Sequence, residues 1–114
     1  MRNRTTVKEL RIHITDVILE FELKEKKRGF KAEHKYPFID LVADFFYWNN
    51  LDYDVELTRE IKREFKEYYR SNTRLRMVPK SKLKIETLSV DELIKRLLGK
   101  YQEKINKDKW NTED

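Results

Sequence analysis

With 114 residues, of which 39% are hydrophobic and 41% charged, the chain is long enough for one small domain with a single core, and it is too apolar to be intrinsically disordered. It has no cysteine, which excludes disulfides, thiolate metal sites and cysteine nucleophiles, and it has no apolar run of the roughly 18 residues that a membrane span needs. The net charge of +5 favours a polyanionic partner, and the N-terminal MRNRTT lacks the apolar stretch of a signal peptide, so we expect a cytoplasmic protein.

The first predicted element is an amphipathic helix. Thr6 and Glu9 have the spacing of a capping box, and Gly29, after the basic run KEKKR, is a plausible helix stop. The alternating segments LRIHI and LEFEL favour strands instead, but the apolar stripe persists for about four turns, so we prefer the helix. The stripe consists of Val7, Leu10, Ile14, Val17, Ile18 and Phe21.

The next segments predict strands. Alternation in GFKAEHKY, 29–36, indicates one strand, and LDYDVELT, 51–58, indicates another. The segment FIDLVADFFYW, 38–48, is ambiguous: its aromatic content favours a buried strand, joined to the next by a hairpin through Asn49 and Asn50. Its apolar spacing also suits a helix with Pro37 at the first position.

The second half of the chain predicts a helix over 58–71, short strands over 74–79 and 82–88, and a final helix. Ser89 and Glu92 form the capping box that opens this last helix. Its inward face is expected to carry Leu93, Leu97 and Tyr101, widened by Ile94, Leu98 and Ile105.

The predicted fold is therefore an α/β domain of order α-β-β-β-α-β-β-α, covering residues 1–105 and followed by a polar tail, 106–114. The alternative keeps 36–49 helical and treats 74–87 as a hairpin. That alternative is a mostly helical winged-helix domain.

Carboxylates in the segment 34–58 suggest a metal site. If 38–48 and 51–58 are adjacent strands, Asp40 and Glu56 can point to the same side, with Asp44 as an extra ligand on the face of Asp40. Convergent carboxylates hold Mg²⁺, and a nuclease uses this ion to orient water and to neutralise the phosphate. The alternative for both acids is a solvated position on an exposed hairpin.

The run KKRGFKAEHKYPFIDLVAD, followed by YDVELT, resembles the restriction-endonuclease-like PD-(D/E)xK superfamily, with the layout of small archaeal Holliday-junction resolvases. The resemblance implies a Mg²⁺-dependent DNA endonuclease that acts on branched DNA as a homodimer. It assigns the metal to Asp40, Glu56 and Glu9, with Glu33 as a substitute for Glu9.

The chain departs from that motif at the lysine. Thr58 stands at the lysine position and Ile39 at the proline position, so the resemblance assigns the lysine role to Lys62 on the following helix. Catalytic residues would then be Asp40, Glu56 and Lys62. Without a working Lys62, the fold would retain only nucleic-acid binding.

Two basic clusters, KEKKRGFK and RLRMVPKSKLK, predict contacts with nucleic acid, or else ordinary solubility charge. The resemblance implies DNA rather than RNA. The alternative function is a non-enzymatic winged-helix regulator with 57–70 as recognition helix, and a third is a protein-binding inhibitor or adaptor. The histidines His13 and His34 lack zinc-type spacing and predict structural or surface roles. The predicted nucleic-acid contacts are Lys26, Lys27, Arg28, Lys31, Lys80 and Lys82.

Overall fold

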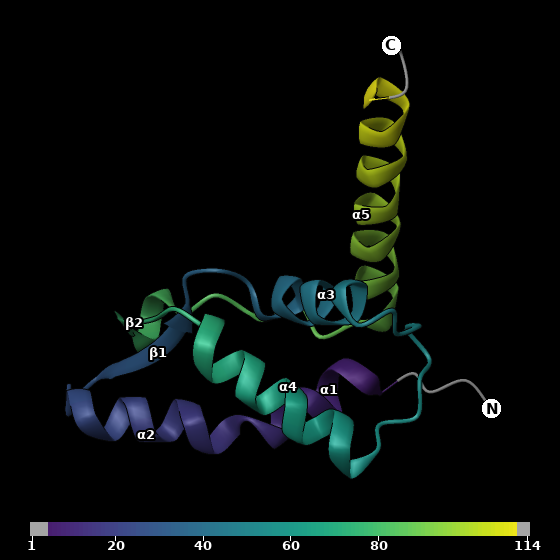
Figure 1. Ribbon diagram of the computed structural model, residues 1–114. Helices are drawn as coiled ribbons and strands as arrows, with labels where there is room; N and C mark the ends of the chain where they lie inside the picture. The colour runs from purple at the N-terminus through teal and green to yellow at the C-terminus, as the bar shows by residue number, and fades with distance from the viewer. Residues whose placement is uncertain (1–4, 112–114) are drawn as a thin grey trace.

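The computed structural model describes residues 5–111, with side chains described as far as residue 106. This part of the chain is mixed α/β and mostly helical, with five α-helices and one two-stranded antiparallel sheet (Figure 1). The elements are α1 (Thr6–His13), α2 (Thr15–Glu25), β1 (Phe30–His34), α3 (Phe38–Trp48), α4 (Arg59–Asn72), β2 (Leu75–Pro79), the 3₁₀ turn η1 (Lys80–Lys82) and α5 (Val90–Asn111).

The predicted first helix is two helices, α1 and α2, which meet at Ile14 (φ −103°, ψ 6°). The Thr15 hydroxyl donates to the carbonyl of Arg11 at 3.0 Å, and such a bond to the preceding turn commonly bends a helix. Thr6, expected as the cap, is instead the first helical residue, and its hydroxyl donates to the carbonyl of Tyr53 at 3.2 Å. The turn into β1 places Gly29 at φ +79°, a backbone conformation that glycine adopts without strain.

The strand predicted for 38–48 is wrong, because this segment is helix α3 and the competing helical expectation is confirmed. Its apolar side chains recur at helical rather than alternating spacing, and that period outweighs the β propensity of its aromatic residues. Pro37 precedes the helix with φ −53°, and Asn50 follows it with φ 54°. The strand predicted for 51–58 is irregular chain, so the predicted hairpin between 38–48 and 51–58 does not form.

The sheet joins two strands that the sequence predicted separately. β1 pairs antiparallel with β2, from Phe30 opposite Pro79 to His34 opposite Leu75. The strand predicted for 82–88 and the hairpin predicted for 74–87 are both wrong. After η1 the chain runs over the sheet as irregular backbone, and residues 83–88 are called the strap below.

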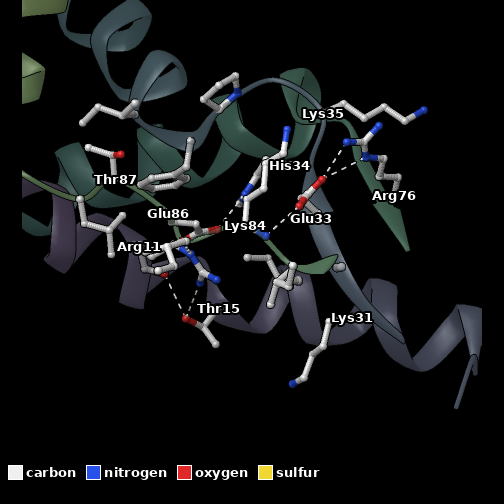
Figure 2. A pocket seen from close by; sticks show the side chains of 18 of the residues that line it. Arg11, Thr15, Lys31, Glu33, His34, Lys35, Arg76, Lys84, Glu86 and Thr87 are labelled. Carbon is white, nitrogen blue, oxygen red and sulfur yellow. Dashed lines mark hydrogen bonds and ion pairs between the residues drawn. The ribbon is translucent and has the colours of Figure 1, made fainter. Parts of the chain in front are cut away.

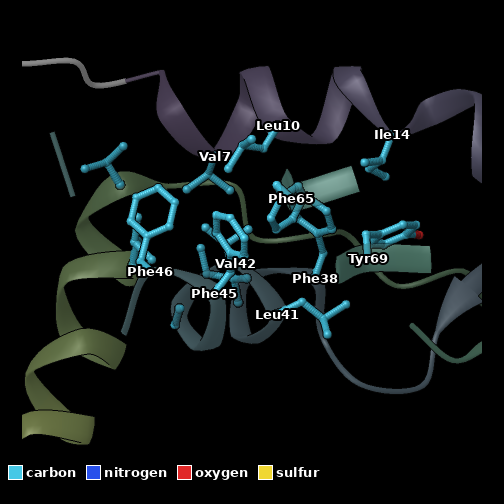
Figure 3. Packing of buried hydrophobic residues seen from close by; sticks show 14 of the residues in the cluster. Val7, Leu10, Ile14, Phe38, Leu41, Val42, Phe45, Phe46, Phe65 and Tyr69 are labelled. Carbon is cyan, nitrogen blue, oxygen red and sulfur yellow. The ribbon is translucent and has the colours of Figure 1, made fainter. Parts of the chain in front are cut away.

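The core lies between α1, α3, α4 and the start of α5 (Figure 3). Thr58 caps the start of helix α4, and its hydroxyl accepts the Ile61 backbone N–H at 3.1 Å. The helix contributes the fully buried Phe65. The Phe65 ring meets Phe38 and Phe45 of α3 edge to face, with centroids 5.8 and 5.3 Å apart. Aromatic packing of this kind locks α4 onto α3.

Helix α5 only partly fulfils its prediction. The Ser89 hydroxyl accepts the Asp91 N–H at 3.1 Å, as expected of a cap, and Leu93 and Leu97 are buried. Farther along, the side chains expected to face inward are exposed, and Figure 1 shows this half of the helix leaving the body. The predicted polar tail, 106–114, lies partly outside the described residues, and α5 includes it as far as Asn111.

Candidate functional site

The carboxylates of α3 face cations on α5. Asp40 accepts a hydrogen bond from Arg96 Nε at 2.7 Å, and Asp44 forms an ion pair with Lys100. The two acids are four residues apart on α3, and their two partners are four residues apart on α5. Two successive turns of α3 therefore bind two successive turns of α5. Tyr36 also donates to Asp44 at 3.0 Å. The acids of this apolar segment therefore join two helices.

The remaining residues of the predicted metal site lie on separate elements. Glu56 is exposed in the irregular segment before α4, Lys62 is on α4, and Glu9 is on α1. Its substitute Glu33 is on β1, where it accepts a hydrogen bond from Arg76 at 2.8 Å. Among residues 5–106, no three histidine, aspartate or glutamate side chains are grouped to hold a metal ion. The Mg²⁺ site thus stays a prediction of the resemblance.

Asp40→Asn tests the two roles of this residue. We expect the free energy of unfolding to fall by about 0.5–1 kcal/mol, the range of partly exposed ion pairs. Urea unfolding with and without MgCl₂ measures it, and we expect Mg²⁺ to leave the difference unchanged because Arg96 already neutralises the carboxylate. Stabilisation of the wild type alone by Mg²⁺, or Mg²⁺-dependent cleavage of branched DNA by the wild type alone, would instead support the metal site.

A cavity of about 790 Å³ opens between α2, β1 and the strap (Figure 2). The strap is held there by Glu86, which accepts hydrogen bonds from Arg11 of α1 at 2.8 Å and from His34 of β1 at 3.0 Å. The backbone N–H of Lys84 adds a bond to Glu33 at 3.1 Å. One carboxylate therefore joins the strap to a helix and to the sheet.

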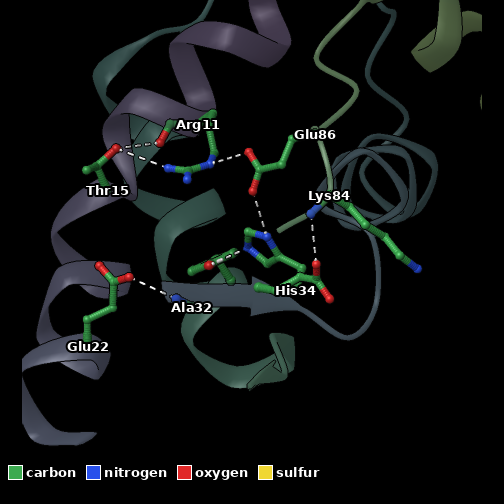
Figure 4. Close-up of polar contacts among 9 residues, drawn as sticks. Arg11, Thr15, Glu22, Ala32, His34, Lys84 and Glu86 are labelled. Carbon is green, nitrogen blue, oxygen red and sulfur yellow. Dashed lines mark hydrogen bonds and ion pairs between the residues drawn. The ribbon is translucent and has the colours of Figure 1, made fainter. Parts of the chain in front are cut away.

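His34 is the centre of a polar chain that reaches the core (Figure 4). Its side chain is 4% exposed, with Nδ1 against Glu86 and Nε2 2.7 Å from the Tyr69 hydroxyl. Since a carboxylate only accepts, the neutral ring carries its proton on Nδ1 and accepts from Tyr69. The structural role predicted for His34 fits this arrangement.

Glu86→Gln is expected to loosen the strap in a pH-dependent way. Burial raises the pKa of Glu86, but hydrogen bonds from His34 and Arg11 outweigh it and hold the pKa below its ordinary value of 4.5. A carboxyl with a depressed pKa stabilises the fold fully above its unfolded pKa, and this stabilisation is lost as pH falls through the folded pKa. We expect a loss of about 1–2 kcal/mol at pH 7 that shrinks as pH falls below 4.5, measured by urea unfolding. A loss of equal size at every pH would contradict this role.

Pairing of β1 with β2 brings the two predicted basic clusters together. The Lys80 N–H donates to the carbonyl of Gly29 at 3.0 Å, so η1 lies beside the turn that enters β1. We call residues 24–31 and 80–84 the basic tip. Its cations are exposed, and within the described part of the chain none of them forms an ion pair with a carboxylate. They are Lys24, Lys26, Lys27, Arg28, Lys31, Lys80, Lys82 and Lys84.

The net positive charge of the molecule is concentrated at the basic tip. Its eight cations are opposed by one acid within the tip, Glu25, so it carries +7, whereas the whole chain carries +5. The rest of the chain is therefore slightly acidic. The sequence showed both basic clusters but not that they are adjacent, because the strands that join them are far apart in the chain.

Helix α4, the alternative recognition helix, is held differently. Lys66 forms an ion pair with Asp16 of α2 at 2.7 Å, and Arg70 pairs with Glu20 at 3.8 Å. The other cations of α4 alternate with glutamates. Its outer face therefore has mixed charge, unlike the basic tip.

No protein family, curated protein or solved structure matched the chain in the three comparisons. No helix among the described residues combines the length and apolar character required to cross a bilayer.

Proposed function

We propose that this protein binds nucleic acid through its phosphates, with the basic tip as the contact surface. The observation that carries the proposal is the concentration of charge: the tip bears +7 in a chain of net charge +5. Cations without carboxylate partners are free to replace the counterions condensed on a nucleic-acid backbone, and release of those counterions drives binding.

The composition of the basic tip supports binding that does not depend on sequence. Seven of its eight cations are lysines, and a lysine ammonium acts as a point charge on phosphate. Only Arg28 has a planar guanidinium group, which can form two hydrogen bonds with the edge of a guanine base. Contacts of the lysine kind position a protein on the backbone without reading bases. The resemblance to a family of DNA endonucleases favours DNA as the nucleic acid that binds.

Fluorescence anisotropy with labelled DNA tests the proposal. We expect duplexes of unrelated sequence to bind with similar affinity, and the logarithm of the association constant to fall linearly with the logarithm of salt concentration, by about 0.9 per phosphate contact. Polyglutamate and vesicles with anionic lipids serve as comparison polyanions. Absence of DNA binding at low salt, affinity that ignores salt, or tighter binding to vesicles than to DNA would overturn the proposal.

A further inference from the structure

The cavity between α2, β1 and the strap has no role in the proposed binding of nucleic acid, although Lys31 and Lys84 belong both to its lining and to the basic tip. Its volume of about 790 Å³ lies within the range of small-molecule sites, about 300–1,000 Å³. The cavity follows β1 over residues 31–35, a distance of about 13 Å at the rise of an extended strand (Figure 2). It is therefore long enough for an elongated ligand.

The apolar walls that a ligand could reach are aliphatic. Leu19 of α2 and Leu83 of the strap line the cavity and are 50% and 43% exposed, so about half of each residue is left for a ligand to cover. Among the described residues of the lining, two carry aromatic rings, His34 and Phe38. Both rings are buried, and they already pack against each other and against Tyr69. Because planar ligands such as bases stack on exposed rings, these walls favour a hydrocarbon chain instead.

The ionisable side chains around the cavity leave an excess of positive charge. Six cations and three acids line it, which gives a net charge of +3. All three acids accept hydrogen bonds from other parts of the fold. A cleft edged by charge of one sign concentrates ligands of the opposite sign, so the ligand should be an anion. Three of the cations are exposed lysines that form no ion pair with a carboxylate among the described residues: Lys31, Lys35 and Lys84.

We propose that this cavity binds a single-chain amphipathic anion, that is, an alkyl chain with one acidic head group. The chain lies between α2 and the strap, where it covers Leu19 and Leu83, and the head group stays at the rim among the lysines. An extended chain of about ten carbon atoms matches the length of residues 31–35, because bonds of about 1.5 Å advance somewhat less than their length in a zigzag. This inference does not depend on the proposed binding of nucleic acid.

NMR titration of the ¹⁵N-labelled protein with decanoate, at concentrations too low for micelles, tests the proposal. We expect saturable binding of one molecule per chain, with the largest shifts in the amide signals of Leu19, Ala32 and Leu83. From hexanoate to decanoate the affinity should rise about fourfold per methylene, the increment expected when each methylene is buried. Decyl phosphate should bind as decanoate does, whereas decanol and decyltrimethylammonium should bind at least ~10-fold more weakly.

Two variants separate the alkyl chain from the head group. Leu19→Asn with Leu83→Asn should weaken decanoate binding at least ~10-fold, and the fold should survive because both side chains are partly exposed. Lys31→Ala with Lys35→Ala and Lys84→Ala should weaken decanoate about 10-fold and leave decanol unchanged, because decanol has no charge for the lysines to attract. Circular dichroism checks that each variant is folded.

A matched control changes two exposed leucines outside the cavity. Leu23 and Leu98 are 72% and 63% exposed, and Leu23→Asn with Leu98→Asn should leave decanoate binding unchanged. The proposal is overturned if decanoate does not bind saturably, if decyltrimethylammonium binds as tightly, or if the shifts centre on Leu98 of α5. It is also overturned if the control variant weakens binding as much as the change of Leu19 and Leu83. The comparison of head groups and the shifts use the wild type, so they decide the matter even if a variant fails to fold.

Discussion

Replacing Lys26, Lys27 and Lys80 with alanine is expected to weaken binding to duplex DNA by about 10²–10³-fold near 0.1 M salt. Each lysine that contacts a phosphate contributes about 0.9 to the salt slope, so the slope should become shallower by about three. The three residues lie on both segments of the basic tip, which the backbone bond from Lys80 to Gly29 holds together. They are exposed, so their removal should leave the free energy of unfolding nearly unchanged.

The matched control removes three cations from α4. Changing Arg59, Lys62 and Arg63 to alanine alters the net charge equally, but α4 is the surface that a winged-helix protein would use. We expect this variant to lose less than tenfold in affinity and to keep its salt slope, as measured by anisotropy over a salt series. Equal losses in the two variants would mean that net charge alone drives binding. A larger loss from α4 would move the contact surface to that helix.

The elements that the sequence predicted correctly are those with one dominant local signal. The alternation around β1 and the capping serine of α5 are examples. Helix α3 was misassigned because two local signals conflict there: aromatic residues favour a strand, but the apolar spacing is helical. In the strap, a clear local signal predicts a strand that does not form. Residues 82–88 alternate like a strand, yet Glu86 holds them through side-chain bonds.

The candidate site could be predicted only in its parts. Lysine-rich segments are visible in the sequence, but their adjacency follows from pairing of β1 with β2, whose partners Phe30 and Pro79 are distant in the chain. No local pattern specifies which strand a short strand will join. The roles of Asp40 and Asp44 could not be predicted either. Their partners, Arg96 and Lys100, lie on α5, and the sequence does not show where α5 packs.

Phe65→Ala is expected to cost about 3–5 kcal/mol of unfolding free energy, the range for a large buried aromatic residue. The Phe65 side chain is fully buried, and it lies within 6.4 Å of four aromatic rings from α3 and α4. Truncation leaves a cavity in the contact that fixes α4 against α3. Since small domains have about 5–15 kcal/mol of stability, the loss is a large fraction of the total. Urea unfolding followed by circular dichroism measures it.

Two further variants separate packing from other causes. Phe65→Leu keeps most of the volume, so it should cost less than Phe65→Ala, by about 1.5–3 kcal/mol. Ile85→Ala removes a comparable aliphatic side chain that is 98% exposed on the strap, and it should change stability by less than about 0.5 kcal/mol. If Phe65→Ala were as mild as Ile85→Ala, α4 would not be packed on α3 in solution.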